Sequence, residues 1–79
     1  MKLKKNIALS DSGFIFDPGT GNSFTTNPIG LHMIQLLKQE KSPKEIEAAI
    51  RDEYQVDGVT FERDYFDFIS VLGKLKLLE

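Results

Sequence analysis

The chain has 79 residues, no cysteine and a formal net charge of −2 at pH 7. A chain this short forms one domain that buries roughly 60 to 65% of its unfolded surface, which leaves little room for an enclosed active site. The missing cysteines exclude disulfides and cysteine zinc sites, and the net charge argues against general attraction to nucleic acid or an anionic membrane. We therefore expect residues 1–79 to form a single domain without a metal or cofactor.

The N-terminal segment, MKLKKNIALS, is basic, but its apolar part is too short for a signal peptide or a membrane span. We expect a soluble, cytoplasmic protein.

The first third of the chain has the two-residue period of β-strands. Large apolar residues alternate with small or polar ones in three short runs, which predicts three antiparallel strands. The apolar members are Ile7, Leu9, Phe14, Phe16 and Phe24. We place the first turn at residues 11–12 and the second at residues 18–21.

The second turn contains GTG at residues 19–21, which superficially resembles a phosphate-binding loop. No helix follows it, and neither GxGxxG nor GxxxxGK[ST] can be written through the segment. Pro18 instead sets φ for a turn, and Asp17 can close an Asx turn. Gly19 and Gly21 can adopt positive φ, so we interpret the segment as a hairpin.

Two helices begin at recognisable caps. Asn27 is a good N-cap with Pro28 at the first helical position, and Ser42 with Glu45 forms a capping box that has Pro43 inside it. The apolar stripes that follow are Gly30, Met33, Ile34 and Leu37 in the first helix and Ile46, Ala49, Ile50 and Tyr54 in the second.

We expect Thr60 to cap a third helix. Its apolar stripe and the tail after it comprise Phe61, Tyr65, Phe68, Ile69, Leu72, Leu75, Leu77 and Leu78.

The predicted order is β-β-β-α-α-α, an α+β, winged-helix-like domain whose helices pack on one face of a three-stranded antiparallel sheet. If the strands pair in sequence order, the third strand, NSFTT at residues 22–26, lies at an edge. It has neither lysine nor proline, the residues that usually protect an edge from pairing. Such an edge is either a liability or a binding site.

The run FDPGTGNSFTTNPIGLHMIQLLKQEKSPKEIEAAIRDEYQV resembles the PqqD family of pyrroloquinoline quinone biosynthesis, which also defines the recognition element of peptide natural-product pathways. The resemblance spans residues 8–78. Its matching residues are Asp17, Gly21, Asn27, Gly30, Glu45, Ile46 and Tyr54, then Asp64, Phe68, Ile69, Leu72 and Leu77 in the closing helix. The departures are Thr26, where the family usually has an apolar residue, and Glu40-Lys41, where it usually has glycine.

The resemblance implies a peptide-binding protein and not an enzyme. Family members bind the leader of a ribosomally made precursor peptide, which adds as a strand beside the third strand and lies between it and the third helix. They then present it to a modifying enzyme, a radical SAM protein in the quinone pathway. This mode of binding is β-augmentation, in which backbone hydrogen bonds supply affinity and side-chain pockets supply specificity.

The peptide-binding surface that we predict combines the third strand with one flank of the third helix. The strand residues are Asn22, Ser23, Phe24, Thr25 and Thr26, and the helix residues are Phe66, Ile69, Ser70 and Gly73. Phe66 lies outside the core stripe, so it either lines the groove or is simply a partly exposed aromatic. If Phe66 instead belongs to the core, the groove wall lies on the flank of Asp64 and Val71. The third strand could also pair with a second copy of the chain and form a homodimer.

His32, the single histidine, has no partners aligned for a metal or catalytic site, so we interpret it as an ordinary helix residue. The alternative functions are a winged-helix DNA-binding regulator and a generic protein-interaction domain. Residues 61–74 carry two basic and three acidic side chains, a net charge of −1, which argues against a helix that approaches phosphates.

Overall fold

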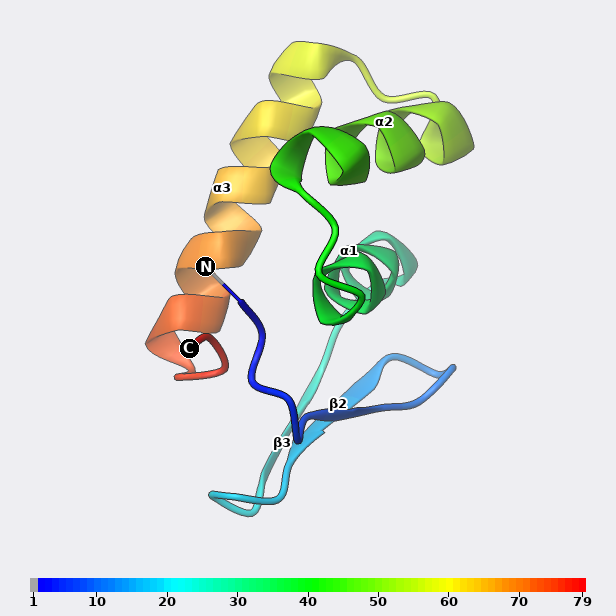
Figure 1. Ribbon diagram of the computed structural model, residues 1–79. Coiled ribbons are helices and arrows are strands. Elements are labelled where there is room, and N and C mark those ends of the chain that lie inside the picture. Colours follow the sequence, from blue (N-terminus) through cyan, green and yellow to red (C-terminus); the bar gives the residue numbers. More distant parts are fainter. Residues whose placement is uncertain (1) are drawn as a thin grey trace.

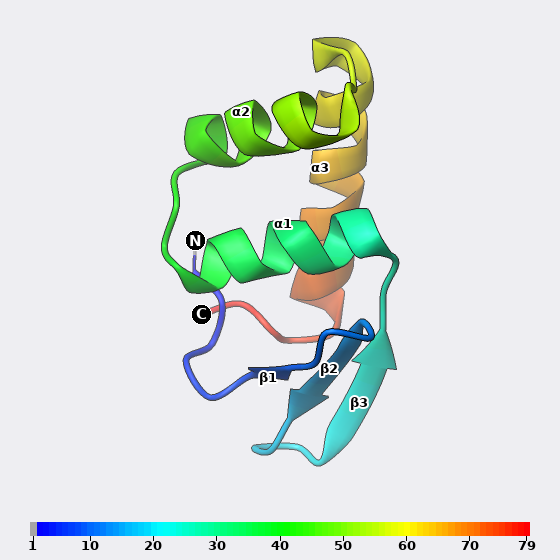
Figure 2. The ribbon, with the colours of Figure 1, turned by 90° about the vertical axis from the view of Figure 1, so that its right-hand side faces the viewer.

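The computed structural model describes residues 2–79, which form three strands followed by three helices. The strands are β1 (Ala8–Leu9), β2 (Phe14–Asp17) and β3 (Asn22–Thr25), paired antiparallel in the order β1-β2-β3. The helices are α1 (Pro28–Lys38), α2 (Pro43–Tyr54) and α3 (Gly58–Lys74) (Figure 1). The helices lie together on one side of the sheet, with α1 between the sheet and α2 (Figure 2). The predicted α+β class and strand order are confirmed.

The two faces of the sheet differ in burial, and the burial of the β2 residues corrects the predicted strand pattern. Ile15 and Asp17 are buried, whereas Phe14 and Phe16 are 52% and 43% exposed. Ile15 pairs with Phe24, which packs against the core, so these two side chains share the inner face. Phe14 and Phe16 share the outer face, because successive side chains on a strand point to opposite sides. The expected alternation with small or polar residues is wrong for this strand, since Ile15 between them is large, apolar and buried.

The turn between β2 and β3 explains why Asp17 faces inward. Its side-chain Oδ1 accepts a hydrogen bond from the Gly19 N–H at 2.9 Å, and its backbone oxygen accepts one from the Gly21 N–H at 2.8 Å. The predicted Asx turn is therefore confirmed. Positive φ is confirmed for Gly21 (77°) but not for Gly19, since one left-handed residue at the end of the loop is enough to return the chain to β3.

The caps of α1 and α2 are confirmed. Asn27 Oδ1 accepts from the Gly30 N–H at 2.7 Å. In the capping box, Ser42 Oγ accepts from the Glu45 N–H at 3.2 Å, and Glu45 Oε1 accepts from the Ser42 N–H at 2.8 Å. These side chains satisfy backbone N–H groups that have no partner inside a helix, so they set where each helix starts.

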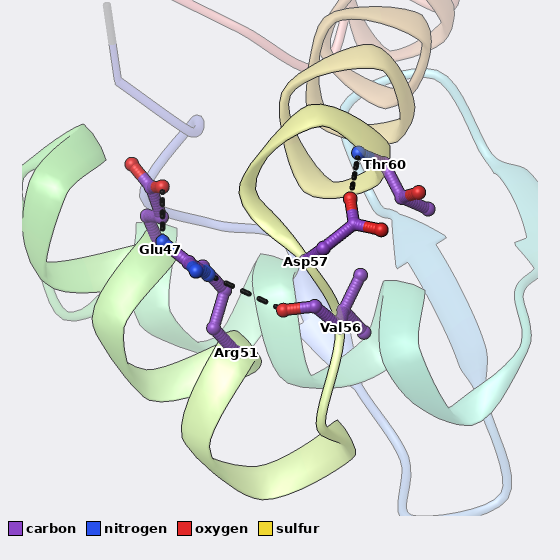
Figure 3. A network of polar contacts seen from close by, with 5 residues as sticks. All are labelled: Glu47, Arg51, Val56, Asp57 and Thr60. Carbon is purple, nitrogen blue, oxygen red and sulfur yellow. Dashed lines mark hydrogen bonds and ion pairs between the residues drawn. The ribbon is translucent and has the colours of Figure 1, made fainter.

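The cap of α3 is a correction. Asp57, not Thr60, is the N-cap, and its Oδ1 accepts from the Thr60 N–H at 2.7 Å (Figure 3). This hydrogen bond lowers the pKa of the Asp57 carboxyl. Aspartate outranks threonine as a cap, so the helix starts at Gly58, three residues earlier than predicted. Arg51 of α2 holds the preceding loop, because its Nε donates to the Val56 carbonyl at 3.2 Å while it pairs with Glu47.

The core joins the inner face of the sheet to all three helices and to both ends of the chain. Leu3 and Leu78 form a β-bridge, and the Lys4 N–H donates to the Leu77 carbonyl at 2.9 Å. Both ends meet near the C-terminal end of α1 (Figure 2). The buried apolar residues are Leu3, Ile7, Ile15, Met33, Ile34, Leu37, Ile46, Ile50, Phe61, Tyr65, Leu72 and Leu77. Phe68 and Ile69, which we expected in the core stripe of α3, are only partly buried against this cluster.

Candidate functional site

The outer edge of β3 presents unpaired backbone groups. The Thr26 N–H donates to the Gly13 carbonyl at 2.9 Å, and partners in an antiparallel pair alternate between bonded and non-bonded positions. Phe24 therefore turns its N–H and C=O toward β2, while Ser23 and Thr25 turn theirs outward. Within residues 2–79 no strand pairs with this side of β3. The edge predicted from sequence order is thus a row of free donors and acceptors.

A groove of about 400 Å³ lies at the C-terminal end of β3, between its junction with α1 and one flank of α3. Its apolar part comes from both helices, and two aspartates stand on the α3 side. The lining residues are Thr26, Asn27, Ile29, Gly30, Met33, Asp64, Asp67, Phe68 and Val71. We call this the β3–α3 groove.

Gly30 allows the closest approach in the groove. A Cβ at this position would lie 2.0 Å from Thr26 Oγ1 and 3.2 Å from Phe68 Cε1. A side chain here would therefore require Thr26, Asn27 or Phe68 to shift. Glycine at position 30 keeps the two walls of the groove together.

The strand half of the predicted surface lies at the free edge of the sheet. Asn22, Ser23 and Thr25 are exposed, and Phe24 and Thr26 are half-buried with their side chains toward the helices. Thr26 lines the β3–α3 groove directly.

The structure places the helix half of the predicted surface on the other flank of α3. Phe66 is 63% exposed and lines a hollow of about 250 Å³ with Pro43, Lys44 and Glu47 of α2. At about 100° per residue, its direction differs by about 160° from that of Asp64, which lines the groove. Ile69 packs against the core, while Ser70 and Gly73 are exposed.

The α3 residues beside β3 are therefore Asp64, Asp67, Phe68 and Val71, of which Val71 is 49% exposed. The predicted groove wall is on the opposite flank, with the Asp64 and Val71 flank as the alternative, because a helical stripe defines the core-facing side and has two flanks. Which flank meets β3 depends on the direction in which α3 crosses α1. The sequence signal for this flank is the pair of apolar residues Phe68 and Val71 beside Asp64 and Asp67.

The acidic side chains of the groove have few partners in the protein. Arg63 Nε lies 3.5 Å from Asp64 Oδ1, but both side chains are well exposed, at 71% and 57%. Such a pair contributes little to stability. Asp67 makes no ion pair within the described part of the chain.

Other features of the molecule carry less chemistry. His32 is half-buried and packs edge-to-face against Tyr54, with ring centroids 5.8 Å apart. In residues 2–79 no three histidine, aspartate or glutamate side chains come together as metal ligands would. Over the same residues, no helix has the length and hydropathy needed to cross a bilayer.

Comparison with known families identifies the fold. Residues 13–78 match the family model described as coenzyme PQQ synthesis protein D (PqqD). The chain belongs to the PqqD family. Among solved structures, this PqqD-family chain is similar to the one titled "TbiB1 in Complex with the TbiA(beta) Leader Peptide". The TM-score is 0.88 at 36% identity, and the match covers 100% of this chain and 95% of that one. A search of curated proteins found no match.

Proposed function

We propose that this protein binds the leader segment of a ribosomally made precursor peptide by strand addition to β3. The observation that carries the proposal is the full-length similarity to TbiB1, a protein whose structure was solved with a leader peptide. The unpaired edge of β3 next to the β3–α3 groove supports it from the geometry.

In the proposed complex, the leader's backbone bonds to the outward N–H and C=O groups of Ser23 and Thr25. These bonds depend little on the leader's sequence. Alternate leader side chains point toward the helices and enter the β3–α3 groove, where Ile29, Phe68 and Val71 supply apolar contacts. Affinity therefore comes from the strand, and choice of peptide comes from the groove.

The protein's proposed role ends at binding and presentation. The bound leader holds the remainder of the precursor where a separate modifying enzyme, a radical SAM protein or another peptide-modifying enzyme, can act on it. The domain itself needs no reactive group for this task, because the chemistry takes place on the partner.

The test is an amide NMR titration with a precursor leader peptide, taken from a short peptide gene if one lies beside the gene for this protein. We expect shifts and exchange protection at residues 22–26 and at the groove positions of α3, namely Asp64, Asp67, Phe68 and Val71. Residues 44–53, on the far side of α2, should stay unchanged. Perturbations confined to α2 and the C-terminal tail would contradict strand addition even if the peptide binds.

The same edge of β3 could pair with a second copy of the chain when no peptide is present. Sedimentation measurements with and without peptide test this. A dimer that dissociates as peptide is added would indicate that both partners use β3. A dimer unaffected by saturating peptide would place the contact elsewhere.

A further inference from the structure

The β3–α3 groove has an apolar floor, formed by Ile29, Met33 and Val71, and a negatively charged rim, formed by Asp64 and Asp67. Asp64 and Asp67 are three residues apart on α3, so they lie on the same side of the helix. Both line the groove beside Ile29, Met33 and Val71, and no lysine, arginine or histidine lines it in the described chain. A peptide lying there meets two carboxylates next to an apolar surface.

Four of the protein's ten lysine and arginine side chains lie around another hollow. Lys2, Lys4, Lys5 and Lys38 surround a separate hollow at the C-terminal end of α1, whereas Ile29 and Gly30 at its N-terminal end line the groove. The 11 residues of α1 span about 16 Å, more than the roughly 8 Å over which salt screens charges at physiological ionic strength. These four lysines therefore do little to neutralise Asp64 and Asp67.

Among the described residues, Arg63 is the one ion-pair partner of these two aspartates, and the pair is weak. Arg63 is the sequence neighbour of Asp64 and lies 3.5 Å from it, with both side chains in water. A cation on the bound peptide can displace such a contact at small cost. Asp67 is available without any displacement.

We infer that the leader recognised by this protein places a lysine or arginine against Asp64 and Asp67, next to an apolar side chain that fills the groove floor. This inference rests on the proposed function and names the class of peptide. The alkyl stem of lysine or arginine can cover the apolar floor while its charged head reaches the carboxylates. The same rim disfavours leaders with acidic residues at that position, so it acts mainly in specificity.

The expected size of the effect is modest. Each exposed ion pair contributes up to about fivefold in affinity, so two carboxylates should favour a basic over a neutral residue by about three- to tenfold. Because the contact is exposed to solvent, high salt should remove most of this preference.

The experiment uses a displayed library of random peptides, selected on the wild-type protein and on the Asp64→Asn/Asp67→Asn variant. The matched control is Asp52→Asn/Glu53→Gln, which removes two charges from exposed positions of α2 that lie outside the groove. Binding of selected peptides is then measured as synthetic peptides at low and high salt. Each is also measured against Thr25→Pro, which blocks the β3 edge.

Peptides selected on the wild type and on the control should share a lysine or arginine at a constant spacing from an apolar residue. The groove variant should lose the basic preference, retain the apolar one, and bind with little salt dependence. Two outcomes would overturn the inference but leave the proposed function standing. In one, the peptides need the β3 edge but show no preference for a basic residue; in the other, they bind the groove variant as well as the wild type. Failure to obtain any peptide sensitive to Thr25→Pro would overturn the proposed function and the inference with it.

Discussion

The two flanks of α3 both offer an aromatic side chain outside the core, yet only one of them lies beside a free strand edge. Phe66 faces α2 and is 63% exposed, whereas Phe68 is partly buried in the wall of the β3–α3 groove. Exposure alone would favour Phe66 as the binding residue. The position of the unpaired backbone of β3 favours the other flank, because strand addition can occur only next to it.

The buried side of α3 lies between its two flanks. We expect truncation of a residue there to lower stability, and binding with it, because the whole helix loses its anchor. Leu72 lies on the buried side of α3 and is 1% exposed. Leu72→Ala should lower the free energy of unfolding by about 2 to 5 kcal/mol, a large share of the stability of a small domain. Urea denaturation measures this directly. A loss below about 1 kcal/mol would mean that α3 is not anchored through this residue.

A change at the strand edge should affect binding and leave the fold intact. Thr25→Pro removes a backbone donor that points away from β2, so it should weaken peptide binding by about 1 to 3 kcal/mol with little loss of stability. Phe24→Pro is the control, because the Phe24 N–H points toward β2 and its loss should lower the melting temperature. Equal peptide affinity in Thr25→Pro and wild type, measured by calorimetry, would exclude strand addition at this edge.

Matched truncations on the two flanks test the comparison itself. Phe68→Ala should reduce peptide affinity about tenfold or more, a loss near 1.4 kcal/mol, whereas Phe66→Ala should change affinity by less than about twofold. Both variants need melting curves, since Phe68 also packs against the core.

Val71→Ala separates the two roles of the groove wall. Val71 is 49% exposed, so its truncation should reduce affinity while the melting temperature stays within a few degrees of wild type. If Phe66→Ala weakens binding more than Phe68→Ala and Val71→Ala do, the peptide lies on the α2 flank.

The smallest expected effect concerns the cap that sets the start of α3. The backbone hydrogen bond from Thr60 lowers the pKa of Asp57 in the folded state, so this contribution to stability is complete above the carboxyl's unfolded pKa. It should disappear as the pH falls through the folded pKa, below about pH 4. Asp57→Asn keeps a good cap without a titrating group.

Melting temperatures of wild type and Asp57→Asn should therefore converge or cross on acidification, while peptide binding at neutral pH stays the same for both. Parallel pH profiles would show that the cap is not linked to the charge of Asp57.

Local chemistry determined much of this protein before any tertiary contact was known. The caps at Asn27 and Ser42, the Asx turn at Asp17 and the apolar periods of α1 and α2 all act over a few residues, so they can be predicted directly. The free edge followed from the order of short, closely linked strands. The cap of α3 was misplaced only because two adequate caps, Asp57 and Thr60, stand three residues apart.

Tertiary structure decided the features that depend on direction. Ile15 faces the core, whereas Phe14 and Phe16 face outward. The reason is that Ile15 pairs with Phe24 on the face of the sheet that the helices cover. The bridge from Leu3 to Leu78 joins residues at opposite ends of the sequence, which no local pattern encodes. The flank of α3 that meets β3 was also undetermined. A helical stripe specifies which side of the helix is buried, but it does not specify which of the two flanks lies toward β3. Only the packing of α3 against α1 and α2 decides between the two flanks.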